Sequence, residues 1–522
     1  MPAAVVAAAM AMASNGWAQK SGGTLKIQHM DTPPSASIHE EATVSTAVPF
    51  MSIYNNLVIF DQHVAKNSFE SIVPDLATQW KWSEDGKQLV FTLRQGVKWH
   101  DGKPFTAKDV ECTFEMLLSG ESKLRRNPRG AWYGNVEKVT ADGDYAATFH
   151  LKDRQPSLLA LLASGYTPIY PCHVSGADMR RRPIGTGPFK FVELKMNEGV
   201  KLTKNTEYWK PGRPYLDAIE YTVIADRSTR MLSFASGKFD MTFPTDLTVP
   251  LYKNMMKDAP HVKCTMRDTG VSTNLIVNRD APPFDNPKIR RALAQTLDRQ
   301  AFIDILSEGE GKMGGAMLPP PSGVWGMPPE MVKSIVGYDN VAANREKGRE
   351  LMKEAGYGPD KRLKVKVSTR NIATFRDPAT ILIDHLKHIY VDAELEVIDT
   401  SIYYNRVFKK DYTVALNLTG SAVDDPDVTF FEGYACGSLR NYNNYCDPEM
   451  TKLFQAQSRE LDHEKRMKMV WDIDRKLQED IARPIIAHNR AAGCWQPYVK
   501  GVVLHSNSIY NATRFEDVWL DK

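Results

Sequence analysis

The sequence predicts an α/β or mixed α+β protein built from several domain-sized units. Its 522 residues correspond to about three to four units of roughly 150 residues each. Hydrophobic residues make up 42% and charged residues 25% of the chain, which excludes collagenous, low-complexity and wholly disordered classes. Along the chain, segments of alternating hydrophobicity are interspersed with segments of helical periodicity, so strands and helices are expected to alternate.

The first half is predicted to contain strands, a well-marked helix and a hairpin. Residues Thr24–His29 alternate apolar and polar side chains, as a half-buried strand does. Thr106 followed by Asp109 has the spacing of a capping box and predicts that a helix begins there. Two further strands, Phe189–Leu194 and Val200–Thr203, are close enough to form a hairpin.

The second half repeats the alternation. A helix is expected to begin at Pro287, since proline is favoured at the first helical position, and its apolar face continues to Phe302. A strand over 363–367, a helix over 379–389, a strand over 393–398 and helices over about 449–461 and 464–478 follow.

The charge balance excludes a nucleic-acid-binding function. Lysine plus arginine (66) against aspartate plus glutamate (63) gives a net charge of +3, and the signs alternate along the chain. A nucleic-acid-binding domain would instead show a basic patch or stripe.

The first residues have the character of an export signal. An uncharged run from Ala3 to Ala13 is followed by small residues at 16 and 18, the pattern of a signal peptide cleaved after Ala18. No basic residue precedes Lys20, so a disordered alanine-rich tail is the alternative. The run is too short to span a membrane, which takes about 20 apolar residues. We therefore expect an exported, soluble chain, without a lipid anchor because Gln19 rather than cysteine follows.

In an oxidising compartment the six cysteines are candidates for disulfides. Cys436 and Cys446 enclose a short polar loop and are the pair we expect to be bridged first. A zinc site is less favoured there, because neither cysteine lies in a C-x-x-C motif and no histidine is near. We expect the other four to be small buried apolar residues, with a second bridge among them left open: Cys112, Cys172, Cys264 and Cys494.

Several long motifs, in order, resemble the family 5 extracellular solute-binding proteins, the dipeptide, oligopeptide and nickel receptors of ABC importers. The most specific is the segment 73–110, with V-P-D-L-A, W-K-W-S-E-D-G-K and F-T-L-R-Q-G-V-K-W-H-D-G-K-P-F-T-A-K-D-V. G-T-G-P-F at 185–189, the segment 205–240 and P-F-D-N-P-K-I-R-R-A-L at 283–293 follow. The resemblance extends from about Gly23 to the C-terminus.

This resemblance implies a bilobal periplasmic clamp of the type II, or cluster C, kind. Lobe I would comprise residues 19–269, with an extra subdomain at about 57–180; lobe II would comprise 270–487, and 488–522 would return to lobe I. The crossovers would lie near Gly270 and His488, and closure by hinge motion would present the loaded receptor to an ABC permease. We expect a periplasmic monomer that is not an enzyme and needs no cofactor.

The resemblance also suggests site residues. Peptide receptors of this family place an acidic residue against the ligand amine and an arginine against its carboxylate. Asp424 matches the acidic position and Arg370 matches the arginine. The alternative for Arg370 is a solvated surface residue without a role in binding. Asp425 and Asp427 fit turn carboxylates before Pro426 better.

Two further features bear on the ligand. Ser421 stands where peptide receptors of this family have a tryptophan. The site therefore lacks one aromatic wall and has more space, which argues against a simple dipeptide as the ligand. The loop from Met30 to Glu41 is a further candidate for lining the cleft.

Other functions remain as alternatives. The same architecture would suit a non-peptide organic solute such as an opine or an oligosaccharide. Nickel or haem binding is less favoured: His385 and His388 share a helix face, but no carboxylate or cysteine completes a ligand set. A secreted hydrolase is remote, since the sequence has neither a G-x-S-x-G nor an H-E-x-x-H motif.

Overall fold

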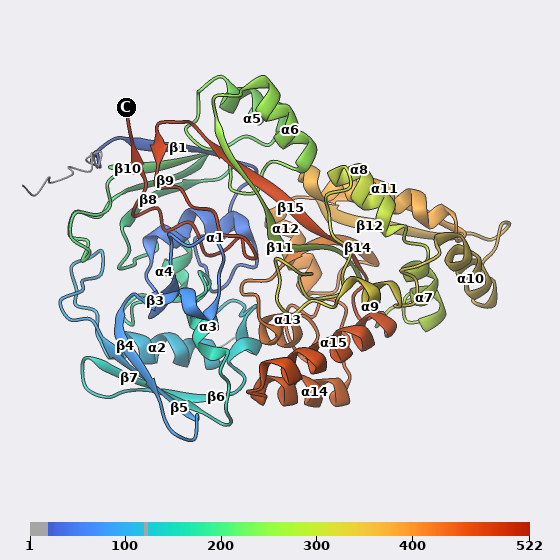
Figure 1. The fold of residues 1–522 in the computed structure, drawn as a ribbon, viewed down its shortest axis with the longest axis horizontal. Coiled ribbons are helices and arrows are strands. Elements are labelled where there is room, and N and C mark those ends of the chain that lie inside the picture. The colour runs from blue at the N-terminus through green and yellow to red at the C-terminus, as the bar shows by residue number, and fades with distance from the viewer. Residues whose placement is uncertain (1–18, 120–123) are drawn as a thin grey trace, which may run out of the picture.

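The computed structural model describes residues 19–119 and 124–522, so the expected signal peptide lies outside the described residues. Two lobes lie side by side, each built around its own sheet, with another four-stranded sheet at the lower left of the view (Figure 1). The bilobal α/β architecture is thus as the resemblance implies.

The first lobe is organised by a four-stranded sheet in the order β1-β10-β9-β8. Its strands are β1 (Thr24–His29), β8 (Phe189–Lys195), β9 (Gly199–Lys204) and β10 (Ala218–Val223). β8 and β9 form the expected antiparallel hairpin, whereas β1 pairs in parallel with β10, far away in sequence. Leu25 and Ile27 on β1 are fully buried, which explains the alternation seen in the sequence.

A second sheet, in the order β4-β5-β7-β6, lies within residues 57–180, the stretch for which an extra subdomain is expected. Its strands are β4 (Ala77–Trp82), β5 (Gln88–Leu93), β6 (Val136–Ala141) and β7 (Ala146–Leu151), and helix α2 (Ala107–Leu118) packs against β6. The Asp109 carboxylate accepts a hydrogen bond from the Thr106 backbone N–H at 3.0 Å, half of the predicted capping box.

The second lobe contains a five-stranded sheet in the order β13-β12-β14-β11-β15. β12 (Leu363–Arg370) pairs in parallel with β13 (Val391–Ile398) and with β14 (Val414–Gly420). β11 (Lys263–Val277) pairs antiparallel with β14 and β15 (Ile485–Trp495). Helix α11 (Ala373–Lys387) covers β12 and β13 and buries Leu382 and Leu386.

One predicted helix is two. The expectation of a single apolar face from Pro287 to Phe302 is wrong: α7 (Pro287–Gln295) ends, and α8 (Arg299–Ser307) begins after a short break. The Asp298 carboxylate accepts a hydrogen bond from Ala301 N at 3.0 Å, so it starts a new helix within the continuous apolar pattern.

β11 and β15 are long strands that run through both halves of the molecule (Figure 1). Their register shifts between the pairs Asp268–Arg490 and Ser272–His488, and Gly270 lies in that irregularity with φ of +68°. A side chain at residue 270 would be strained there, and its Cβ would come within 2.4 Å of the Asn507 carbonyl oxygen. The two strands are therefore locally irregular at the same level of the sheet.

The remaining elements connect or cover these sheets. They are α1 (Val44–Phe50), β2 (Val58–Phe60), β3 (Ile72–Pro74), α3 (Leu158–Ala163), α4 (Gly176–Arg181), α5 (Arg227–Ala235), α6 (Val249–Asp258), α9 (Pro329–Lys333), α10 (Val341–Glu354), α12 (Thr400–Phe408), α13 (Pro426–Gly433), α14 (Pro448–Arg459), α15 (His463–Glu479), β16 (Val499–Lys500) and β17 (Trp519–Leu520).

All six cysteines are bridged. Cys436 is joined to Cys446, the pair that the sequence singled out. The other four, among which one further bridge was left open, form two disulfides, Cys112–Cys172 and Cys264–Cys494. The expectation that all four are buried is wrong, since Cys172 is exposed. The bridge Cys264–Cys494 joins residues that face each other across β11 and β15, a proximity that only strand pairing creates.

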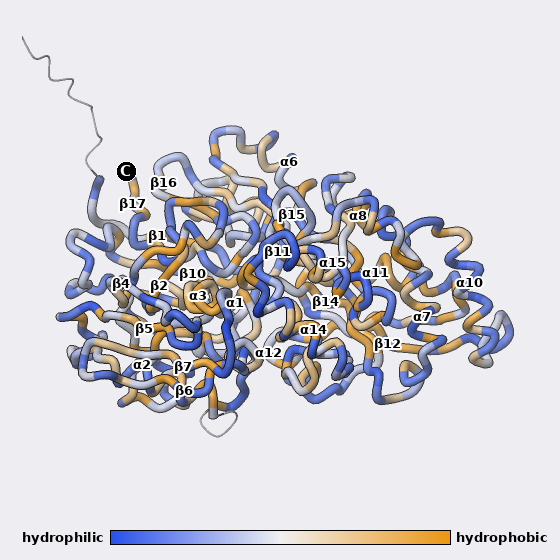
Figure 2. Tube along the Cα trace, turned by 60° about the horizontal axis from the view of Figure 1, so that its bottom comes forward, coloured by the Kyte–Doolittle hydropathy of each residue, from blue (hydrophilic) through white to orange (hydrophobic). Residues whose placement is uncertain are grey.

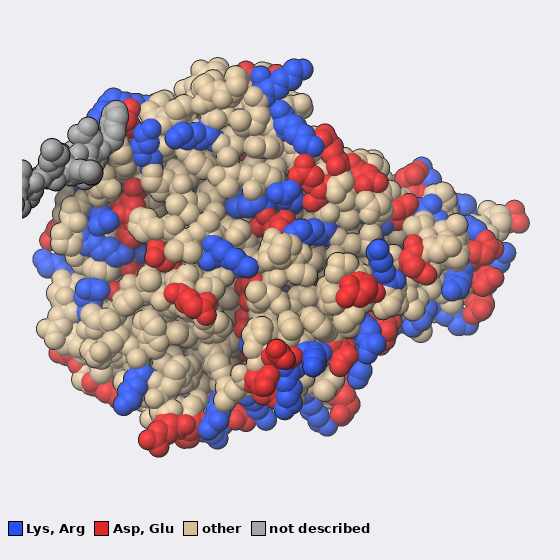
Figure 3. Space-filling model, viewed as in Figure 1, with Lys and Arg blue, Asp and Glu red and all other residues tan. Residues whose placement is uncertain are grey.

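The surface and interior follow the expected partition. Apolar segments follow the strands and inner helices, whereas many of the outer loops are hydrophilic (Figure 2). Acidic and basic side chains are intermixed over the face shown in Figure 3, in line with the small net charge. Within the described ranges no helix has both the length and the apolar character needed to cross a membrane.

Candidate functional site

A cavity of about 350 Å³ lies between the part of the chain that precedes Gly270 and the part that follows it. Met30, Arg227 and Thr245 line it from one side, and Phe302, Arg370 and Tyr404 line it from the other. Its volume falls in the range of small-molecule sites, which are commonly placed at domain interfaces. The location identifies it as an interlobe site.

The walls are largely apolar. Phe302, Leu306, Phe375, Tyr404 and Tyr510 supply aromatic and aliphatic surface. Such a surface binds an apolar portion of a solute through burial, at about 25 cal/mol per Å². Met30 is the residue of the predicted 30–41 loop that reaches the cavity.

Arg370 lines the cavity, but its charge is already paired. Its Nη2 donates to Asp31 Oδ2 at 2.8 Å, and its Nε donates to Thr400 Oγ1 at 3.1 Å. Burial alone would lower the pKa of Arg370, but the neighbouring Tyr404 and Asp31 outweigh it and raise the pKa above its usual value. Asp31 also accepts hydrogen bonds from Thr400 and Ser45, so this carboxylate is fully engaged.

Three further arginines line the cavity. Arg440 pairs with Glu432, and Arg490 pairs with Asp268 and Glu310. Arg227, at the start of α5, pairs with Asp377 of α11 at 2.9 Å, a contact between the two lobes. The cavity is therefore rich in guanidinium groups that are oriented by carboxylates.

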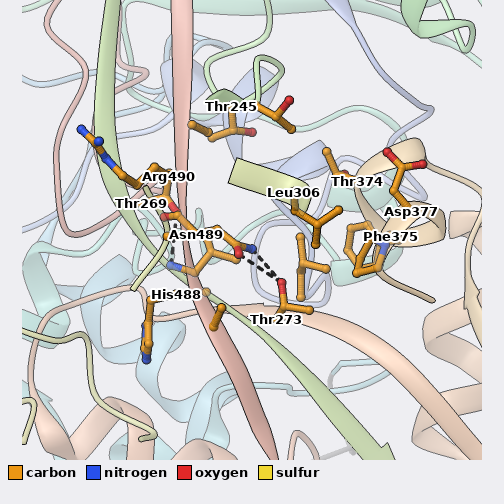
Figure 4. A pocket seen from close by; sticks show the side chains of 18 of the residues that line it. Thr245, Thr269, Thr273, Leu306, Thr374, Phe375, Asp377, His488, Asn489 and Arg490 are labelled. Atoms are coloured by element: carbon orange, nitrogen blue, oxygen red, sulfur yellow. Dashed lines mark hydrogen bonds between the residues drawn. The ribbon is translucent and has the colours of Figure 1, made fainter. Parts of the chain in front are cut away.

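The wall of the cavity that β11 and β15 form carries a polar cluster (Figure 4). Asn489 exchanges hydrogen bonds with Thr273 at 3.0 and 3.1 Å, and Thr269 Oγ1 donates to the Asn489 carbonyl oxygen at 2.9 Å. The neighbouring His488 bonds to the Gly315 carbonyl oxygen through Nε2, and burial lowers the pKa of this imidazole to about 4. It is neutral at physiological pH.

Asp424 and Ser421 line a smaller cavity of about 40 Å³. It adjoins the main cavity, because Gly420 and His488 line both. Asp424 Oδ2 accepts a hydrogen bond from Val324 N at 3.1 Å, and the carboxylate forms no ion pair within the described residues. Burial, reinforced by the charge of Asp425, raises the pKa of Asp424 to about 7. Asp424 thus forms no ion pair within the described residues, and the charge of Lys66 offsets only part of the rise in its pKa.

The other residues of the 421–427 segment are structural. Ser421 Oγ donates to the Val423 carbonyl oxygen, so the hydroxyl closes its own turn. Asp425 caps α13 by accepting from Asp427 N at 2.9 Å, and it pairs with buried Arg466. Asp427 is also engaged, by Ser157 among others.

The structure brings the predicted residues near one another but not into one chamber. Arg370 faces the main cavity, whereas Asp424 and Ser421 face the smaller one. Arg227 and Asp377 were not predicted, because nothing near either residue in the sequence marks it as part of a site. No group of at least three metal-ligating side chains is found in residues 19–119 and 124–522.

Comparisons with known proteins agree with this architecture. Residues 71–440 match the family model described as bacterial extracellular solute-binding proteins, family 5 (middle). Di/tripeptide-binding protein 1 of Pseudomonas aeruginosa (strain UCBPP-PA14) is 25% identical over 503 residues, covering 90% of this chain and 89% of the relative.

Two solved structures share the fold. DppA of Helicobacter pylori in complex with the peptide STSA superposes with a TM-score of 0.83 at 23% identity, over 96% of this chain and 99% of that one. AgaA of A. tumefaciens R10 in complex with agropinic acid gives a TM-score of 0.84 at 21% identity, over 96% and 99%.

Proposed function

The chain belongs to the bacterial extracellular solute-binding proteins of family 5, and on that premise we propose that it is the periplasmic receptor of an ABC importer. It captures a short peptide or another amino-acid-derived solute between its lobes and delivers it to a membrane permease. It binds the solute without chemical turnover.

The observation that carries this proposal is the interlobe cavity together with the contacts that close it. Asp31–Arg370 and Arg227–Asp377 join the lobes beside the cavity, and Lys253 of α6 pairs with Glu308, which follows α8. Contacts that span two lobes form only when the cleft is closed, so they couple solute capture to a change of shape.

The lobes are proposed to meet at Gly270 and His488, with lobe I at 19–269, lobe II at 270–487 and the return at 488–522. The irregular register of β11 and β15 at these residues supports this boundary. A local loss of regular pairing allows the backbone to bend there more easily than in the regular parts of the ladder.

Asp424 is proposed to bind the amino group of the solute. Its carboxylate forms no ion pair within the described residues and adjoins the main cavity through the smaller one. A charge-assisted hydrogen bond from an ammonium group would favour the ionised form of this carboxyl group, which burial disfavours in the free protein.

A second candidate is a receptor for a non-peptide amino-acid derivative such as an opine. Ser421 contributes no aromatic ring at its own position in the wall of the smaller cavity, so the site suits a branched polar solute as well as a peptide backbone. AgaA, the receptor in complex with agropinic acid, has the same fold.

Thermal unfolding against defined solute pools tests the function. A solute at 100 times its dissociation constant adds about 2.7 kcal/mol to the stability of the folded state. We expect pools of di- and tripeptides to raise the unfolding midpoint, and free sugars or nickel to leave it unchanged. A rise with mannopinic acid alone would favour the second candidate, and no rise with any amino-acid-derived solute would refute the proposal.

A further inference from the structure

A cavity of about 290 Å³ lies outside the interlobe site, between the end of α12 and the disulfide-closed loop 436–446. None of the described residues lines both this cavity and the interlobe one. Phe408, Leu439 and Tyr445 form its apolar walls, and Lys410 is the cationic side chain among the described residues that line it. Its volume is near the lower end of the range for small-molecule sites.

Lys410 is fixed through both its backbone and its amine. It follows the C-cap of α12 with φ of +59°, a left-handed conformation in which helices usually place glycine or asparagine. Its carbonyl oxygen accepts a hydrogen bond from Asn278 Nδ2 at 3.0 Å. Its Nζ donates to the carbonyl oxygens of Asn441 at 2.7 Å and Tyr442 at 2.9 Å. A long side chain at a backbone position that favours glycine suggests a role for that side chain.

The amine of Lys410 keeps one bonding position open. Of the four positions around Nζ, one holds Cε and two hold the N–H groups that donate to the loop carbonyls. The fourth holds a proton in the ammonium form and the lone pair in the amine form. Lys410 forms no ion pair within residues 19–119 and 124–522, and its side chain is half-buried against the cavity. A molecule in this cavity therefore lies beside an amine that no carboxylate occupies.

The surroundings favour the neutral amine. Burial lowers the pKa of Lys410 to about 8, and the charge of Arg483 adds to this effect, whereas exposed Asp280 opposes it. The two neighbouring tyrosines, Tyr412 and Tyr445, carry no charge near neutral pH because burial raises the pKa of both. Lysines that are desolvated in an apolar pocket, or that lie next to another cation, are the ones that proteins use as amine nucleophiles.

The gain in reactivity can be worked out from the pKa. An amine with a pKa of about 8 is about one quarter neutral at pH 7.5, whereas a freely solvated lysine with a pKa of about 10.4 is about 0.1% neutral, a difference of about 200-fold. A less basic amine is also a weaker nucleophile, by roughly tenfold over this difference. Lys410 should therefore react about tenfold faster than a solvated lysine at this pH.

We propose that Lys410 is a covalent modification site, at which its amine adds to the carbonyl carbon of a small aldehyde with an apolar or aromatic body. The ammonium group and the aldehyde together give a protonated imine and water: a C=N bond forms, and the aldehyde oxygen leaves with two of the nitrogen-bound protons. The remaining N–H donates to one of the loop carbonyl oxygens, which also stabilise the positive charge. The apolar walls hold the body of the aldehyde. The site is independent of the solute cavity and of the proposed function.

Reductive trapping of the full chain tests this proposal. Benzaldehyde is added with sodium cyanoborohydride, which reduces the imine to a stable benzylamine, and peptide mass spectrometry locates the adduct. Lys409 is the internal reference, because it is exposed and its side chain forms no hydrogen bond or ion pair in the described ranges. Lys410 should be labelled about tenfold faster than Lys409 at pH 7.5, and this ratio should fall to about one at pH 9.5, where solvated lysines also lose their protons. The ratio cancels the pH dependence of the reagents.

Two variants and a second aldehyde separate reactivity from recognition. Formaldehyde has no body for the walls to bind, so its ratio should be lower than that of benzaldehyde. Leu439→Ala should lower the benzaldehyde ratio and leave the formaldehyde ratio unchanged, and Lys410→Arg should abolish the fast labelling. Equal labelling of Lys409 and Lys410 at pH 7.5, or fast labelling that survives in Lys410→Arg, would overturn the reactive amine. Equal ratios for the two aldehydes in the wild type would overturn the aldehyde-binding cavity.

Discussion

The ion pair between Asp31 and Arg370 should control closure of the lobes more than it controls folding. Asp31 lies just after β1 and Arg370 ends β12, so this pair spans the cleft. Their side chains are 12% and 4% exposed, respectively. Asp31→Asn removes the negative charge and leaves a buried guanidinium with neutral partners only.

The size of the two expected effects, on lobe closure and on the free energy of unfolding, depends on whether the unpaired Arg370 can reach water. Removing one member of a buried ion pair costs about 3–5 kcal/mol when the remaining charge stays buried. Here the lobes can separate and hydrate Arg370 instead. We therefore expect Asp31→Asn to shift the equilibrium between closed and open forms by about 2 kcal/mol, roughly 30-fold, and to lower the free energy of unfolding by only about 1–2 kcal/mol.

A matched pair within one lobe provides the control. Arg230 and Asp246 are 3% and 2% exposed and joined by two hydrogen bonds, but they do not bridge the cleft. Asp246→Asn should lower the free energy of unfolding in urea by about 3–5 kcal/mol without changing the radius of gyration measured by small-angle X-ray scattering. Asp31→Asn should increase that radius. Equal losses of stability in the two variants, with no change in the scattering of either, would refute the reasoning.

Three other perturbations have defined outcomes. Because burial raises the pKa of Asp424 to about 7, the folded, empty receptor holds this proton more tightly than the unfolded chain does. The stability that the proton contributes is fully present below about pH 4 and is lost as the pH rises through 7. A tripeptide with a free amine should accordingly bind about fivefold more tightly at pH 7.5 than at pH 6.0, and a pH slope that persists in Asp424→Asn would assign it to another group. Gly270→Ala should lower the free energy of unfolding by about 1–3 kcal/mol more than Gly237→Ala, since both glycines have positive φ but a Cβ at Gly237 meets nothing within 4 Å; equal losses in urea titrations would contradict the steric argument. Replacing Cys436 and Cys446 by serine should cost about 2–3 kcal/mol for a bridge with a sequence separation of 10, and an unchanged urea midpoint would show that the loop needs no disulfide.

Much of the local structure could be predicted because it depends on neighbours in sequence. The alternation in Thr24–His29, the capping spacing of Thr106 and Asp109, and the hairpin after Phe189 involve residues a few positions apart. The exception between α7 and α8 has the same origin: Asp298 competes as a local cap within an apolar pattern that looks continuous.

The site could be predicted only in part, because its properties depend on partners from distant segments. The sequence placed Arg370 at the end of a strand, but nothing near it in sequence indicated that Asp31, 339 positions away, neutralises it. Likewise, Arg227 has no local feature that distinguishes it from Arg230, and only the tertiary arrangement pairs Arg227 with Asp377 of α11 and Arg230 with Asp246.

The sequence by itself determined the family, the alternation of strands and helices and the existence of a two-lobed clamp, since these are carried by periodicity and by motifs contiguous in the chain. The tertiary structure alone decided which charges cancel and which stay available, and which cysteines meet across β11 and β15. The physical reason is range: hydrogen bonds and ion pairs act over a few ångströms, so their partners are known only after folding has brought distant segments together.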